Sequence, residues 1–350
     1  MRRLSFMLAV AVSSLTVLVR ADDLVLTRFG DYLEALRAQA GIPGLAAAIV
    51  GTTDVKWERA FGRQDVERAV AARADTPFHL DSSAQLIAAA LVLRCVEEGR
   101  LSLDDRIDRF QSSSPDASAT IRQVLSHTSA GADGLTFRYR PERLDALAAP
   151  ISQCAGPSYR GPVAGLLDRL AMYDSVPGPD AGQLVPPADG ITEPTRARYA
   201  DILTRLATPY AVDAAGRPTA SRHAALTITP AGGVVSTVRD LARFDLALKQ
   251  GVLLRADTLA LAWNGPLDRN GQSLPHGLGW FVQSYSGEPV VWQFGVGDNA
   301  SSSIIVTLPR RGLTLILLAN SQGLVRPFPL AAGDLTASPF GRLFLGLFVR

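Results

Sequence analysis

A serine at the start of an apolar run is the residue in this sequence best placed to act as a nucleophile. Ser82 lies in TPFHLDSSAQLIA (76–88), and the apolar residues that follow predict a buried helix. A serine hydroxyl needs a base within hydrogen-bond reach. Positions i and i+3 share one face of a helix, so a lysine three residues later could take the proton. That position is Gln85, whose amide does not titrate in the relevant range.

The other polar residues offer few alternatives as a base. His79 and Asp81 flank the serine, and we expect His79 to point into packing or solvent and Asp81 to cap the helix or lie on the surface. His276 begins the run HGLGW and could act as a substitute base at the edge of the site. The chain has only two lysines, Lys56 and Lys249, and neither is close to the serine in the sequence. Arginine, which supplies nearly all the positive charge, cannot serve as a base.

Hydrophobic periodicity and turn residues predict both helices and strands. Helices are expected over 24–40, from Ser82 to Gly99, after a glycine turn within 229–251 with Ser236 or Thr237 as the cap, and over 339–349. A hairpin is expected over 44–50 and 54–62, and an antiparallel meander over 277–285, 288–295, 300–309 and 312–321. The stretch from about 101 to 200 is typical of short helices joined by long loops.

This order of elements predicts an α+β fold. Strands occur at both ends of the chain and helices in the middle, so the simplest architecture is one antiparallel sheet built from both chain ends, flanked by helices, with a mainly helical domain inserted. We expect a discontinuous sheet domain over 22–80 and 200–350, and the helical domain over 81–199.

The same segments resemble, in order, the serine β-lactamase and penicillin-binding-protein superfamily. The likeness is to its class C β-lactamase, D-alanyl-D-alanine carboxypeptidase and family VIII esterase branch, and it spans nearly the whole chain after the first 23 residues. It rests on GIPGLAAAIV, the Ser82 segment, IRQVLSHTSAG (121–131), PAGGVVSTVRDLARF, HGLGWF, WQFGVG and LILLANS. The resemblance implies a β-lactamase/transpeptidase-like fold with a serine nucleophile.

Two of the family's catalytic motifs are only half kept. The first is Ser-x-x-Lys. Here it is Ser82-Ser83-Ala84-Gln85, which keeps the nucleophile and loses the lysine. The second motif in these branches is Tyr-x-Asn, and its best match is Tyr139-Arg140-Pro141, which keeps the tyrosine and has Pro141 in place of the asparagine.

The third motif, Lys-Thr-Gly or His-x-Gly on a sheet edge, has also lost its cation. It reads Gln293-Phe294-Gly295, so the glycine remains. By resemblance, Gln293 and Gly295 border the binding cleft, and His127 satisfies a buried hydrogen bond beside it. The segment HTSAG (127–131) is not a nucleophile elbow, because it begins with histidine and no strand precedes it.

These departures leave two main hypotheses about function. In the first, the protein is a catalytically impaired homologue that keeps the cleft and binds a cell-wall peptide, a lactam-like ligand or a protein partner. In the second, it is an active serine esterase or peptidase in which Tyr139 or a histidine is the base. A third possibility is a covalent lactam sensor that acylates at Ser82 without deacylating, although Gln85 weakens this hypothesis because acylation also needs the base.

The N-terminal sequence predicts export. Arg2 and Arg3 precede an apolar run from Leu4 to Val19, which is typical of a signal peptide, here with a cut after Ala21. The alternative is an uncleaved membrane anchor, but the run is short for a full span of about 20 residues. We therefore expect a periplasmic or secreted protein with no other membrane segment.

The cysteines, the histidines and the net charge indicate which bonds, cofactors and ligands to expect. Cys95 and Cys154 are the only cysteines, and an oxidising compartment permits a bridge between them but does not require one. We expect both to be packed free thiols, with a disulfide as the alternative. The four histidines show no ligand spacing, so we expect no metal, and WQFGVGD lacks the context of a dinucleotide site, so we expect no cofactor. The net charge of +2 without a basic stripe argues against nucleic acid and leaves a small molecule or cell-wall peptide as the expected ligand.

Overall fold

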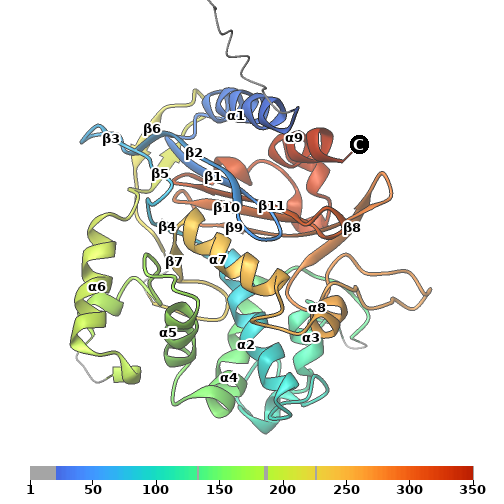
Figure 1. Ribbon diagram of the computed structural model, residues 1–350. Coiled ribbons are helices and arrows are strands. Elements are labelled where there is room, and N and C mark those ends of the chain that lie inside the picture. Colours follow the sequence, from blue (N-terminus) through green and yellow to red (C-terminus); the bar gives the residue numbers. More distant parts are fainter. Residues whose placement is uncertain (1–20, 132–133, 185–187, 225–226, 350) are drawn as a thin grey trace, which may run out of the picture.

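The computed structural model describes residues 21–349, except 132–133, 185–187 and 225–226, and its centre is a seven-stranded antiparallel sheet (Figure 1). The strand order is β3-β2-β1-β11-β10-β9-β8. The strands are β1 (Gly44–Val50), β2 (Val55–Asp65), β3 (Val70–Ala71), β8 (Phe281–Tyr285), β9 (Glu288–Val296), β10 (Ser302–Leu308) and β11 (Leu313–Ala319). Because β1 pairs with β11, both ends of the chain meet in one sheet, as predicted.

Helices cover both faces of this sheet (Figure 1). On one face lie α1 (Ala21–Gln39) and α9 (Pro339–Phe348), and on the other α2 (Gln85–Glu97) and α7 (Val238–Lys249). The remaining helices are α3 (Ile121–Leu125), α4 (Ala148–Ala155), α5 (Arg160–Arg169), α6 (Glu193–Thr204) and α8 (Ala256–Ala262). The predicted α+β class is therefore confirmed.

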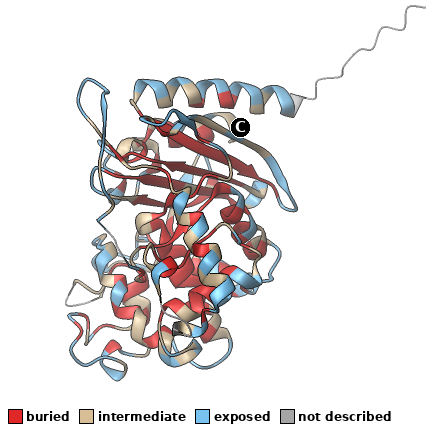
Figure 2. Cartoon of the chain, turned by 90° about the vertical axis from the view of Figure 1, so that its left-hand side faces the viewer, coloured by how far each residue is buried: buried red, intermediate tan, exposed pale blue. Residues whose placement is uncertain are grey.

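The central strand β1 shows why its sequence is continuously apolar. All seven residues of GLAAAIV are buried. Leu45 and Ile49 pack with α1 and α9, whereas Ala46, Ala48 and Val50 pack with α2 and α7. A strand that is covered on both faces needs apolar side chains at every position. Figure 2 shows the sheet and the central helices largely buried, with the outer face of α1 exposed.

The segment before β8 does not form the strand that was expected over 277–285. The strand begins only at Phe281, and Gly279 has φ +103°. A Cβ atom at Gly279 would lie 2.4 Å from the Cβ of Ala89 on α2. The sharp turn therefore brings this segment against the helix that carries the site, and glycine is required there.

Two short strand pairs lie outside the large sheet. β4 (Phe78–His79) pairs with β7 (Val235–Ser236), and β5 (Tyr210–Val212) pairs with β6 (Pro218–Ala220). The β4–β7 pair places the segment before Ser82 beside the start of α7. Thr237, one of the two predicted caps, begins α7, since its hydroxyl accepts a hydrogen bond from the Asp240 backbone N–H at 3.1 Å.

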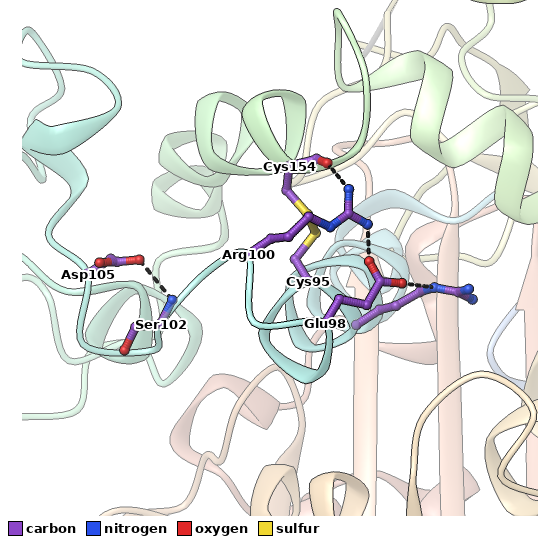
Figure 3. The surroundings of a disulfide bond; sticks show 7 residues. Cys95, Glu98, Arg100, Ser102, Asp105 and Cys154 are labelled. Carbon is purple, nitrogen blue, oxygen red and sulfur yellow. Dashed lines mark hydrogen bonds and ion pairs between the residues drawn. A yellow bond between two sulfur atoms is a disulfide. The ribbon is translucent and has the colours of Figure 1, made fainter.

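The two cysteines form a disulfide bond, so the expectation of free thiols was wrong (Figure 3). Cys95 lies on α2 and Cys154 on α4, with their Cα atoms 6.3 Å apart. The two cysteines have a sequence separation of 59, and their helices meet only through tertiary packing, which no local pattern reveals.

The predicted N-terminal signal peptide falls, apart from Ala21, on residues that the structure does not describe. Within residues 21–349, excluding the gaps, no helix combines the length and apolarity needed to cross a bilayer. The domain boundaries at 81 and 199 stay a prediction.

Candidate active site

Ser82 lies in a single 3₁₀ turn, η1 (Asp81–Ala84), that leads directly into α2. Its side chain is half-buried, and no hydrogen bond among the described residues involves its hydroxyl. The neighbouring strand β9 approaches this turn very closely, because a Cβ atom at Gly295 would lie 2.2 Å from the Leu80 carbonyl oxygen and 2.8 Å from the Ser83 nitrogen. The glycine kept from the third motif is therefore a packing requirement of this turn.

Gln85 occupies the position of the motif lysine, three residues after Ser82, and is fully buried. Its Oε1 atom lies 3.1 Å from Nε2 of His127. The other ring nitrogen of His127, Nδ1, accepts a hydrogen bond from the Arg140 backbone N–H at 3.3 Å. The Nε2 atom must therefore carry the imidazole proton and donate it to Gln85, which fixes both the tautomer and the orientation of the amide.

Tyr139 lies between the two amides that replace the motif cations. Nε2 of Gln85 donates to the Tyr139 hydroxyl at 3.2 Å, and that hydroxyl donates to Oε1 of Gln293 at 3.3 Å. Nε2 of Gln293 donates in turn to the Gly279 carbonyl at 3.2 Å. The result is a continuous chain of hydrogen bonds between neutral groups.

Burial makes Tyr139, His127 and His276 poor bases. It raises the pKa of Tyr139 far above its ordinary value, and the hydrogen bond from Gln85 only partly offsets this. Burial and the neighbouring His276 lower the pKa of His127 well below its usual range. His276 is fully buried and packs edge-on against His127, and burial lowers its pKa to about 3. A tyrosine that keeps its proton and two weakly basic histidines are poor acceptors for the Ser82 proton.

Comparisons with known proteins identify the family and the fold. A family model described as Beta-lactamase matches residues 29–335. The chain belongs to the β-lactamase family. Protein flp of Staphylococcus aureus (strain NCTC 8325 / PS 47) is 29% identical over 94 residues, which cover 25% of this chain and 19% of that protein. The match therefore spans about a fifth of the length of this curated relative.

Solved structures show the same fold at low sequence identity. The octameric penicillin-binding protein homologue from Pyrococcus abyssi superposes with a TM-score of 0.70 at 20% identity, covering 91% of this chain and 77% of that chain. A class C β-lactamase from Rhodobacter sphaeroides gives a TM-score of 0.67 at 17% identity, covering 91% and 97%.

The structure joins three of the residues predicted from the family motifs by hydrogen bonds and places Gly295 against the turn that holds Ser82. Ser82 and Gln85 share one helix start, and Tyr139 and Gln293 are joined to Gln85 by hydrogen bonds. His127 takes part in the buried hydrogen bond that was predicted for it. Pro141 begins the 3₁₀ helix η3 (Pro141–Leu147), and its side chain cannot donate the hydrogen bonds of the family's asparagine.

Asp81 neither caps a helix nor lies on the surface, so that expectation was wrong. Its side chain is 10% exposed, accepts a hydrogen bond from Ser301 Oγ at 2.7 Å and lies 3.0 Å from His79 Nδ1. The backbone of Asp81 has φ +50°, in the left-handed region that non-glycine residues rarely adopt. The carboxylate is held by a polar cluster directly before the nucleophile, and His79 is packed inside it as expected.

Two members of this cluster, His223 and Ser301, were not predicted from the sequence. His223 stacks on His79 with 4.8 Å between ring centroids, and burial together with His79 lowers its pKa to about 4. Ser301 lies at the start of the segment that leads into β10 and contacts both Asp81 and the His223 ring. His223 lies in a polar loop without periodicity, and its rarity as one of four histidines was the only signal.

Neither lysine lies in the site. Lys249 is buried on α7, where its Nζ atom lies 2.7 Å from Asp245 Oδ2 and donates to the Val50 and Gly51 carbonyls. Lys56 pairs with Asp54 on the surface of the β1–β2 hairpin. Among the residues that the structure describes, no group of three or more His, Cys, Asp or Glu side chains is placed to hold a metal ion.

Proposed function

We propose that this chain is an exported member of the β-lactamase family that binds a lactam-like or cell-wall-related ligand at Ser82 and has lost most or all turnover. The observation that carries the proposal is the position of the Tyr139 hydroxyl between the amides of Gln85 and Gln293. In the family motifs these two positions hold a lysine and a lysine or histidine. Cations there would favour the phenolate form of the tyrosine, whereas amides do not.

The loss of turnover follows from the proton that acylation must remove. When the Ser82 hydroxyl attacks a carbonyl, its proton needs an acceptor, and general base assistance is worth about 10²–10⁴-fold in rate. The Tyr139 hydroxyl proton is donated to Gln293, and the Nε2 proton of His127 is donated to Gln85. Losses within one catalytic unit are not additive. Replacing both cations by amides therefore lowers turnover about as much as replacing one of them.

Ligand binding is supported by what remains around the serine. Ser82 is half-buried and its hydroxyl has no hydrogen bond to the described residues, so the hydroxyl can meet a ligand. The names of the similar structures refer to penicillin binding, to β-lactamase activity and, in a third case at 18% identity, to a D-amino acid amidase. These names motivate lactams and D-amino acid derivatives as the first ligands to test.

Export is supported by two independent features. The N-terminal 21 residues have the charge and hydrophobicity of a signal peptide. Cys95 and Cys154 form a disulfide, a bond that persists in oxidising compartments and is rare in the cytosol.

A second candidate is an active serine esterase, and the free hydroxyl of Ser82 favours it. An ester with a good leaving group asks less of a base than an amide does. The raised pKa of Tyr139 and the lowered pKa of His127 weigh against it, because neither group would take a proton readily near pH 7.

Intact mass spectrometry separates these functions. The mature protein is incubated with a penicillin and, separately, with a fluorophosphonate, and the Ser82→Ala variant is the control. We expect no adduct from either probe, together with a lactam-induced rise in melting temperature that shows binding to the folded protein. A Ser82-dependent fluorophosphonate adduct would favour the esterase, and a lasting penicillin adduct would favour a covalent lactam sensor. Absence of both adducts and binding would refute the proposed ligand class.

A further inference from the structure

A hollow with a volume of about 280 Å³ lies between α2 and α5, at the end of α2 opposite Ser82. It is lined by Arg94 on α2 and by Glu98, the C-cap residue of that helix, four positions later and so on the same side. On α5 it is lined by Gly161, Gly165 and Arg169, again at intervals of four. The open space is at Gly165, where a Cβ atom would meet no atom within 4 Å, whereas a Cβ atom at Gly161 would lie 3.3 Å from the Asp189 carbonyl oxygen.

The charges around this hollow are unbalanced. Arg94, Arg100 and Arg169 all line it, and Glu98 is the only acidic residue among the residues that line it. Glu98 is already used, because Nε of Arg94 lies 3.1 Å from one carboxylate oxygen and Arg100 binds the other (Figure 3). In the described part of the chain, Arg169 has no ion pair or hydrogen bond with a carboxylate.

The arginines are also held close to one another. Desolvation and, secondly, the positive charge of Arg94 lower the pKa of the Arg169 guanidinium. Arg100 donates to the Cys154 carbonyl, and the disulfide fixes that carbonyl relative to α2 (Figure 3). Like charges brought together by rigid elements, with space between them, are relieved when an anion enters.

We propose that this hollow binds a phosphate group. Guanidinium groups match the geometry of phosphate oxygens through paired hydrogen bonds, and three of them around one cavity suit a doubly charged anion. The site lies roughly 15–20 Å from Ser82, given a rise of 1.5 Å per residue along the helix between them. It is therefore separate from the active site and does not depend on turnover there.

The test measures phosphate binding by calorimetry and by the shift in melting temperature, at constant ionic strength balanced with chloride. Inorganic phosphate, glycerol 3-phosphate and vesicles containing phosphatidylglycerol are tested separately, so that a free phosphate, a small phosphate ester and a lipid headgroup are distinguished. We expect at least one of them to bind the wild-type protein. If none binds more tightly than chloride does, the proposal is wrong.

Three variants assign any binding to the hollow. Arg169→Gln removes one guanidinium and should weaken binding about tenfold or more, as expected for the loss of a charge-assisted hydrogen bond. Gly165→Leu keeps all three arginines but fills the space, and it replaces glycine with a better helix former, so it should abolish binding without unfolding the protein. Arg310→Gln, which removes the same charge from the exposed turn between β10 and β11, should bind like the wild type.

Two results would contradict the proposal. Equal weakening by Arg169→Gln and Arg310→Gln would mean that phosphate responds to net charge and not to this cavity. Unchanged binding in Gly165→Leu, with the helix content retained by circular dichroism, would place the anion elsewhere on the protein.

Discussion

Replacing cations by amides keeps the shape of a catalytic site while removing its proton chemistry. Gln85 and Gln293 can each donate and accept, so they join His127, Tyr139 and the Gly279 carbonyl without leaving a buried polar atom of the amides unsatisfied. An ammonium at either position would also organise the tyrosine, but it would change the tyrosine's pKa. The neutral chain therefore accounts for an intact geometry around a serine that has no base.

Restoring the base should restore reactivity at Ser82. In Gln85→Lys, the introduced amine would face the His127 Nε2–H, which donates to this position and so stabilises the neutral amine over an ammonium. Burial has the same effect, because residue 85 is fully buried. We expect the rate of Ser82 labelling by a fluorophosphonate to rise by about 10²-fold, the lower end of what a general base supplies.

The matched control for this prediction is Gln85→Met, which has a similar length and no basic group. Both variants are followed by intact mass over time, each in a Ser82→Ala background as well. Equal labelling rates for the lysine and methionine variants would mean that a missing base is not what limits Ser82.

Asp81 and Gly297 should be coupled energetically. A Cβ atom at Gly297 would lie 2.7 Å from Asp81 Oδ1, a separation that real contacts essentially never show. Gly297→Ala should therefore destabilise the wild type by about 1–3 kcal/mol through overpacking. In an Asp81→Gly background the obstructing carboxylate is gone, and the same substitution should have a smaller effect. Urea unfolding of the four proteins measures the coupling, and strictly additive effects would contradict it.

At the scale of elements, the disulfide joins α2, the helix that carries the site, to α4 within the predicted helical region. Cys95 lies near the end of α2 and Cys154 near the end of α4, and their sequence separation is 59. Closing a loop of that size lowers the entropy of the unfolded chain by an amount equivalent to about 4 kcal/mol in the loop-entropy model.

Reduction should lower the free energy of unfolding by about 2–4 kcal/mol, the usual range for a native disulfide. The measurement is urea unfolding at pH 7 with and without a thiol-free reductant. The double variant Cys95→Ala, Cys154→Ala controls for other effects of the reductant and should be insensitive to it. A wild-type midpoint that does not move on reduction, with free thiols confirmed by alkylation, would show that the bond adds no stability.

Local sequence signals predicted the elements, whereas contacts between distant segments were missed. The apolar run of β1, the four C-terminal β-rich runs and the Thr237 cap are properties of a few adjacent residues, and they were found. The hydrogen bond of Asp81 joins it to Ser301, 220 residues later, and the disulfide joins two helices that only tertiary packing brings together. The motif residues were located because the family resemblance carries long-range information that periodicity lacks.

At the scale of the whole molecule, buried histidines make the fold sensitive to acid. The pKa of His127 is well below its ordinary value, that of His223 is about 4 and that of His276 about 3, in each case chiefly because of burial. Each folded-state pKa is lower than the unfolded value of about 6.5, so the unfolded chain takes up protons first as the pH falls. Stability is therefore full above about pH 6.5 and declines as the pH decreases towards 4.

The slope of that decline should be about 1.4 kcal/mol per pH unit for each such histidine. Burial raises the pKa of Asp145, Asp240 and Asp245, and these carboxyls offset part of the loss because they take up protons first in the folded state.

In His276→Phe, one titrating group is removed from a pocket already lined by Phe137 and Phe281. We expect its free energy of unfolding, measured in urea between pH 6.5 and 4.5, to fall less steeply than that of the wild type by about one proton. The comparison uses slopes, so a constant loss of stability from the missing hydrogen bond to the Gly277 carbonyl does not affect it. Parallel slopes would mean that His276 takes up its proton equally in the folded and unfolded states, which its complete burial should prevent.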